Sequence, residues 1–154
     1  REHYNSAGIF ADPNAIAIFG KLHNIIDPPA VVVGDLGEEW DYEVLNQIFR
    51  LLIREPKPEL IAMQLNRYQK DNKNQLILDA GSFIKALEYA ADTTATLIGK
   101  PSPIFFNSAL QTLGATSKEP FWMVGDDLEA DIDAARENHP HVNRKNQPGN
   151  AEGQ

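Results

Sequence analysis

The 154-residue chain contains no cysteine, which excludes disulfide bonds and thiolate zinc sites and leaves the redox compartment unmarked. It also has no apolar run near the roughly 18 residues that suggest a membrane-spanning helix, so we expect no membrane partner. Basic residues are scarce, because 14 Lys and Arg stand against 22 Asp and Glu and give a formal net charge of -8. Affinity for nucleic acid comes largely from basic groups, so we expect no nucleic-acid partner either.

The chain contains enough apolar residues to form a folded core. Hydrophobic residues make up 42% of it, which suits one domain of ordinary size or one small domain plus part of another. Strand-like and helix-like segments alternate, which predicts an α/β fold. Apolar or β-branched runs predict strands at 30–34, 60–63, 94–98 and 121–124. Helical periodicity with caps predicts helices at 42–55, 82–90, 103–113 and 128–137. Residues 138–154 are polar and aperiodic, so we expect a flexible tail there.

The segment Met-Val-Gly-Asp-Asp at 123–127 carries the clearest chemical signal. A short apolar strand ends at a glycine and delivers the carboxylates of Asp126 and Asp127 to its carboxyl end. Asp131 lies on the predicted helix that follows, so its carboxylate can turn back toward the same point. Clustered carboxylates at the carboxyl end of an α/β strand suit a hard cation such as Mg²⁺. Lys100, at the start of an earlier predicted helix, suits a phosphate.

Plain structural roles compete with these interpretations. Asp126 and Asp127 alone could be N-caps that interact with the dipole of the following helix. Asp79 and Ser82 could touch a substrate from a loop, but a helix N-cap explains them equally well. Asp35 follows an apolar strand without a second aspartate two residues on, so we interpret it as a turn residue. A response-regulator-like domain with an acidic Mg²⁺ pocket is disfavoured, because it predicts an acidic pair near the N-terminus.

Two segments resemble the third and fourth motifs of haloacid dehalogenase (HAD) superfamily phosphatases: GKPSPIFF at 99–106 and GDDLEAD at 125–131. More narrowly, the chain resembles the subfamily with a large α/β cap inserted between the second and third motifs (type IIA). The resemblance implies a HAD-like α/β fold with an α/β cap domain and a partial Rossmannoid core. It implies mostly cap over residues 1–98, with the first few ending a core helix, and a partial core with both motifs over 99–137.

The resemblance also implies roles for individual residues. Asp126 would coordinate Mg²⁺ directly, while Asp127 and Asp131 would hold metal waters or support that ligand. Lys100 would neutralise the transferring phosphoryl group and bind substrate, and cap residues Asp79 and Ser82 would contact substrate as well. The implied activity is Mg²⁺-dependent hydrolysis of small phosphorylated metabolites in the cytoplasm.

The sequence departs from the family at its catalytic nucleophile. The family carries this aspartate in an N-terminal strand ending Asp-x-Asp-Gly-Thr, and the 154 residues contain no such motif and no second motif. The resemblance therefore implies a cap plus the C-terminal part of a core, inactive by itself. Its partner would be the N-terminal half of the enzyme or further copies in a homo-oligomer. The alternative is a non-catalytic relative that binds a ligand or partner without turning it over.

Overall fold

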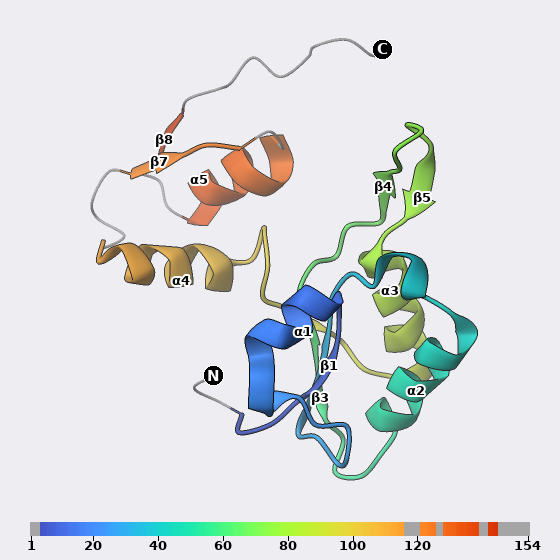
Figure 1. The fold of residues 1–154 in the computed structure, drawn as a ribbon. Coiled ribbons are helices and arrows are strands. Elements are labelled where there is room, and N and C mark those ends of the chain that lie inside the picture. The colour runs from blue at the N-terminus through green and yellow to red at the C-terminus, as the bar shows by residue number, and fades with distance from the viewer. Residues whose placement is uncertain (1–3, 116–120, 126–127, 139–141, 145–154) are drawn as a thin grey trace. The chain divides into compact units, whose positions relative to one another are not determined.

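The computed structural model describes residues 4–115, 121–125, 128–138 and 142–144. The chain divides into two compact units, Arg1–Leu97 and Ile98–Gln154 (Figure 1). None of the helices in the described ranges is long and apolar enough to cross a membrane.

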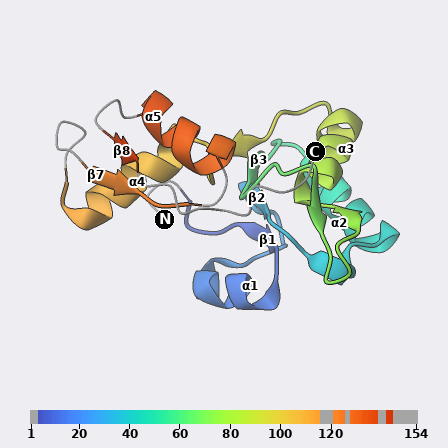
Figure 2. The ribbon, with the colours of Figure 1, turned by 90° about the horizontal axis from the view of Figure 1, so that it is seen from above.

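The first unit is built on a four-stranded parallel sheet in the order β1-β2-β3-β6. Its strands are β1 (Gly8–Phe10), β2 (Ala30–Val33), β3 (Glu59–Ala62) and β6 (Thr96–Leu97). One face is covered by helix α1 (Pro13–Phe19) and the other by α2 (Tyr42–Leu52) and α3 (Ala80–Ala91) (Figure 2). Short 3-10 turns, η1 (Gly20–Leu22) and η2 (Gly37–Glu39), lie in the connections. A parallel sheet between helices confirms the predicted α/β class.

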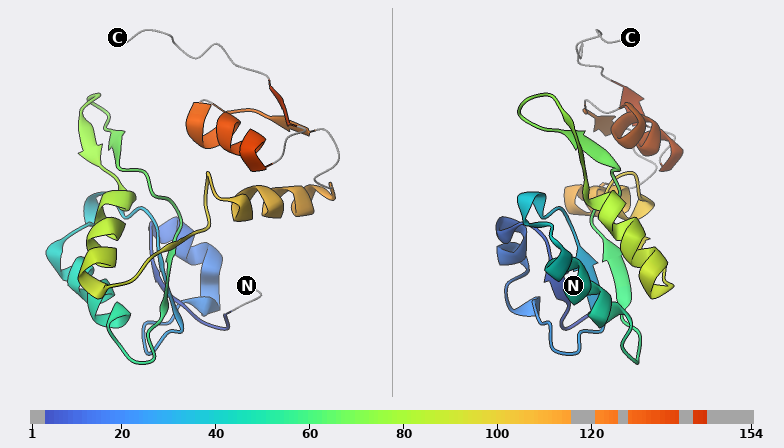
Figure 3. Two further views of the ribbon diagram at one scale, coloured as in Figure 1. Left: turned by 180° about the vertical axis from the view of Figure 1, so that it is seen from behind. Right: turned by 90° about the vertical axis from the view of Figure 1, so that its right-hand side faces the viewer.

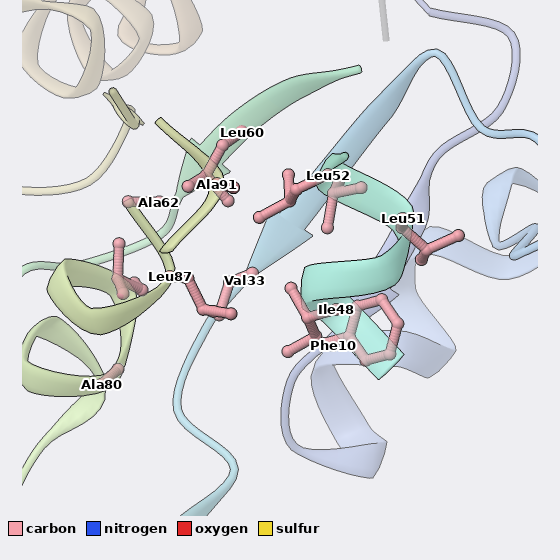
Figure 4. Close-up of a cluster of buried hydrophobic side chains, with 12 residues drawn as sticks. Phe10, Val33, Ile48, Leu51, Leu52, Leu60, Ala62, Ala80, Leu87 and Ala91 are labelled. Atoms are coloured by element: carbon pink, nitrogen blue, oxygen red, sulfur yellow. The ribbon is translucent and has the colours of Figure 1, made fainter. Parts of the chain in front are cut away.

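Strand β2 is buried along its whole length, and its side chains alternate between two apolar clusters. Val31 and Val33 join the cluster formed with α2 and α3, part of which is drawn in Figure 4. Ala30 and Val32 join the cluster on the α1 face. Each fully buried valine or leucine contributes about 1.5–3 kcal/mol relative to an exposed one. The uninterrupted apolar run in the sequence is therefore a strand buried on both faces, as parallel strands usually are.

An antiparallel hairpin, β4 (Tyr68–Lys70) and β5 (Leu76–Leu78), connects β3 to α3. Asp71 fixes its turn, because Oδ1 accepts hydrogen bonds from the backbone N–H groups of Lys73 and Gln75, each at 2.8 Å. No sequence pattern predicts this hairpin, strand β1 or helix α1. All of them are short, and each hairpin strand has only three residues, so no apolar period marks them.

The second unit contains α4 (Pro103–Leu113) and strands β7 (Phe121–Met123) and β8 (Val142–Arg144), with turn η3 (Leu128–Asp133) and α5 (Ala134–Asn138) between the strands. Ser102 caps α4 by accepting a hydrogen bond from the N–H of Ile104 at 3.2 Å, and Gly114 ends the helix at φ 67°. These caps confirm the predicted bounds of the helix. The predicted 128–137 helix begins instead as the π-helical turn η3.

The prediction of a flexible tail over residues 138–154 fails for the three residues of strand β8. Val142–Arg144 runs parallel to β7, with Val142 opposite Phe121. Three residues with a single β-branched side chain show no alternation, so no sequence pattern predicts this strand. Residues 139–141 and 145–154, which make up most of the predicted tail, lie outside the described ranges.

Candidate active site

The candidate site lies where strand β7 ends and turn η3 brings Asp131 back toward it. A Cβ atom placed on Gly125 would lie 2.2 Å from Oδ2 of Asp131 and 2.5 Å from its Cγ. Carbon and oxygen atoms do not approach so closely without bonding, so the carboxylate of Asp131 occupies the space that any side chain at position 125 would need. The glycine of the GDD motif thus lets Asp131 contact the backbone that leads directly into Asp126.

Lys100 and Asp131 form an ion pair at this point. The Nζ atom of Lys100 lies 2.5 Å from Oδ1 of Asp131. The side chain of Asp131 is 3% exposed and that of Lys100 is 41% exposed. A buried carboxylate is costly without a countercharge, and the ammonium supplies it. An ammonium carries three N–H donors, so one ion pair does not exhaust its capacity to bind an anion from the solvent side.

The start of α4 holds Lys100 in place. Ser102 is buried, and its N–H donates to the carbonyl oxygen of Gly99 at 2.9 Å, which closes a turn around Lys100. The Ser102 carbonyl in turn accepts from the N–H of Phe105 at 3.0 Å. Lys100 therefore lies two residues before the N-cap of an 11-residue helix, and the dipole of that helix favours negative charge at its N-terminus. Both features suit a phosphate.

The expected Mg²⁺ site is described only in part. Asp126 and Asp127 lie outside the described residues. Within the ranges that are described, no three histidine, aspartate or glutamate side chains gather closely enough to hold a metal. The donors that the sequence places beside Asp131 are carboxylate oxygens, the ligand type that Mg²⁺ prefers, so this donor set fits the ion.

Asp79 and Ser82 belong to the first unit, where they tie the loop after β3 to the start of α3. Asp79 is 3% exposed and is the N-cap of α3; its Oδ1 accepts from the N–H of Ala80 at 2.6 Å and from Nε2 of Gln64 at 2.8 Å. The Ser82 hydroxyl donates to the carbonyl oxygen of Arg67 at 2.5 Å. No sequence pattern marks Gln64 as part of this loop, apart from its position just past the predicted strand at 60–63.

Removing the charge of Lys100 should destabilise the second unit, because the carboxylate of Asp131 is buried beside it. For Lys100→Met we expect the free energy of unfolding of the second unit to fall by about 1–3 kcal/mol, since Asp131 loses its countercharge while solvent screens part of the effect. Urea unfolding followed by Trp122 fluorescence, in a Trp40→Phe background, reports on this unit alone because the chain has 2 tryptophans. The double variant Lys100→Met, Asp131→Asn should regain most of the loss. Equal destabilisation of the single and double variants would show that the ion pair is not responsible.

Comparisons with known proteins show which family the chain resembles. The HAD-hydrolase-like family model matches residues 97–139, which include Lys100 and Asp131. The chain is 46% identical over 110 residues to phospholysine phosphohistidine inorganic pyrophosphate phosphatase of Xenopus laevis, covering 71% of this chain and 40% of that protein. It is 46% identical over 129 residues to human haloacid dehalogenase-like hydrolase domain-containing protein 2, covering 84% and 48%.

Solved structures show the same fold. NagD from E. coli K-12 matches with a TM-score of 0.76 and 19% identity, over 92% of this chain and 55% of that chain. The 4-nitrophenylphosphatase of Thermotoga maritima matches with a TM-score of 0.75 and 24% identity, over 92% and 54%. The chain thus spans less than half the length of the two curated relatives. With its two family motifs in place and these relatives beside it, the chain belongs to the haloacid dehalogenase-like hydrolases.

Proposed function

We propose that this chain supplies the phosphate-binding and Mg²⁺-binding part of a phosphatase that acts on small phosphorylated metabolites. The observation that carries the proposal is the ion pair of Lys100 and Asp131 against Gly125, ahead of a helix N-terminus. An ammonium in this position neutralises charge on a transferring phosphoryl group. Mg²⁺ held by Asp126, with Asp127 and Asp131 supporting it, would supply further positive charge. The relatives named as phosphatases support the substrate class.

The two units take different parts in this proposal. We propose that residues 1–98, which comprise the first unit and Ile98, are mostly the cap, and that residues 99–137 of the second unit are the partial core. Asp79 and Ser82 hold the loop around Asn66 and Arg67, and this clamped loop is the part of the cap that we propose contacts substrate. We also propose a cytoplasmic location, by resemblance to the family.

The nucleophile would come from a strand that these 154 residues do not contain. We propose that it belongs to the N-terminal half of the enzyme and lies beside β7. The exposed side chains of Trp122 (63%) and Val124 (58%) support this placement, since they offer apolar surface for a neighbouring strand to cover. The alternative, a non-catalytic relative, predicts that the whole protein binds phosphate without turnover.

Magnesium binding tests the metal part of the proposal without any assay of activity. Mg²⁺ keeps several waters and needs few protein ligands, but the ligands from the nucleophile strand are absent here. We therefore expect this chain to bind Mg²⁺ weakly, with a dissociation constant of roughly 1 mM or higher. Titration followed through the NMR signals of Gly125 and Asp131 should show saturable shifts that Asp126→Asn removes. Micromolar affinity, or shifts that persist in Asp126→Asn, would contradict the proposed ligand set.

A further inference from the structure

Glu59 lies on the less covered face of the sheet in the first unit. Among the described helices of this unit, α1 lies on that face, and α2 and α3 lie on the other (Figure 3). In strand β3, Leu60 and Ala62 belong to the cluster under α2 and α3 and are 0% exposed. Glu59 and Ile61 alternate with them and are only half-buried. The carboxylate of Glu59 is therefore open to side chains from other segments that cross this face.

The two oxygens of this carboxylate accept hydrogen bonds from opposite sides of the sheet. Oε2 accepts from the hydroxyl of Tyr4, in the segment before β1, and Oε1 accepts from the hydroxyl of Thr96 in β6 at 2.7 Å. Strands β1 and β6 are the two outer strands of the sheet. Hydrogen bonds to an ionised acceptor are roughly twice as strong as those between neutral groups. A single carboxylate thus joins the segment that leads into the first strand to the last strand of the unit.

Tyr4 is held in place for this contact. It packs against the apolar cluster that β1 and β2 form on the same face. The pKa of its hydroxyl is raised from the ordinary value of 10.0, first by the hydrogen bond to Glu59, then by burial and by the negative charge of the same carboxylate. At neutral pH the hydroxyl therefore keeps the proton that it donates to Glu59.

We propose that Glu59 is a positioning residue that couples the entry segment of the first unit, residues 4–7, to its exit strand β6, so that the two open together. The inference rests on the proposed function, in which the chain enters the cap after its first few residues and leaves it at residue 98. The connections of a cap absorb the backbone changes by which it moves, so a side chain that joins them makes the cap move as one body.

Hydrogen exchange tests the coupling in both directions. On the 154-residue chain, Tyr4→Phe removes a hydroxyl from the entry segment, and we expect the β6 amides to exchange about threefold faster or more, because the Glu59 carboxylate loses one of its anchors. Thr96→Val should raise by a similar factor the exchange rate of the Ala7 amide, which donates to the carbonyl oxygen of Leu22 at 2.8 Å. NMR reads both rates residue by residue.

Two further variants show whether Glu59 carries the effect. In a Glu59→Gln background both rates should already be raised, and adding Tyr4→Phe should change the β6 rates by less than about twofold. The matched control is Tyr89→Phe, which removes the same hydroxyl from a tyrosine that is 92% exposed. This control should stay within about twofold of the unchanged chain.

The titration of Tyr4 gives a readout that a general loss of packing would not produce. With ¹³C-labelled tyrosine, the Tyr4 signal is assigned by its absence in Tyr4→Phe, and its pKa is followed by NMR. Glu59→Gln removes the negative charge and the ionised acceptor, so the pKa of Tyr4 should fall toward 10.0.

Two results would overturn the proposal. One is that Tyr4→Phe and Thr96→Val each speed exchange only in their own segment, since the two ends would then open separately. The other is a pKa of Tyr4 that Glu59→Gln leaves unchanged. Neither measurement involves turnover, so failure of the coupling leaves the proposed phosphatase activity standing, and an inactive enzyme leaves the coupling standing.

Discussion

The purified 154-residue chain should hydrolyse p-nitrophenyl phosphate no faster than the uncatalysed background, with or without Mg²⁺. Lys100 and a bound metal can stabilise charge, but oriented charge accelerates the reaction only when a nucleophile is positioned to attack. The family's nucleophilic aspartate has no counterpart in these residues. Loss of a nucleophile alone costs about a millionfold in kcat in well-studied hydrolases, which would place any residual rate below detection.

The control for this assay separates the proposed site from contamination. Any observed rate should be the same in the unchanged chain and in Asp126→Asn. Mg²⁺-dependent turnover that Asp126→Asn abolishes would mean that the chain supplies its own nucleophile, and our account of its missing part would be wrong.

Gly81→Ala should destabilise the first unit strongly. A Cβ atom on Gly81 would lie 2.4 Å from both the carbonyl carbon and the oxygen of Leu65, and 2.5 Å from the oxygen of Asn66. These are backbone atoms, so the loop after β3 must move, and the 2.9 Å hydrogen bond from the Gly81 N–H to Asn66 would weaken. We expect a loss of about 2–4 kcal/mol in the free energy of unfolding, the range typical of overpacking combined with a broken hydrogen bond.

Gly8→Ala is the matched control for this substitution. A Cβ on Gly8 would meet its nearest neighbour, Cγ of Pro28, at 3.4 Å, which is close to ordinary contact. We expect a change of less than about 1 kcal/mol there. Both variants can be compared by urea unfolding, with Trp40 as the reporter in a Trp122→Phe background. Equal and small losses for both glycines would show that the loop is not held against α3 as the structure describes.

The parts of the fold that the sequence predicted are those with strong local signals. The N-caps at Asp41 and Ser102 and the glycine after α4 mark helix ends by side-chain chemistry that acts within one turn. The buried strand β2 stands out because all four of its residues are apolar. The β4–β5 hairpin depends instead on Asp71 bonding across its own turn, and short exposed strands give no pattern to find.

In the candidate site, too, the sequence predicted local features but not the contacts between residues far apart in the chain. From the GDD motif we predicted that the strand ends at Gly125 and that the carboxylate of Asp131 can turn back toward this point. Sequence alone could not show that Asp131 occupies the very space a side chain at 125 would fill. Nor could it link Gln64 to Asp79, 15 residues apart, since that hydrogen bond depends on how the loop after β3 folds back onto α3.

We expect Lys100 and the carboxylates near Asp131 to serve a nucleophile supplied by another part of the protein. The test is a chimera in which this chain follows the part of human haloacid dehalogenase-like hydrolase domain-containing protein 2 that precedes its matched region. The chimera is assayed for Mg²⁺-dependent release of p-nitrophenol. We predict turnover in the chimera, none in the chain alone, and a loss of at least about a hundredfold in the Lys100→Met chimera. A chimera that retains full activity with Lys100→Met would contradict the account.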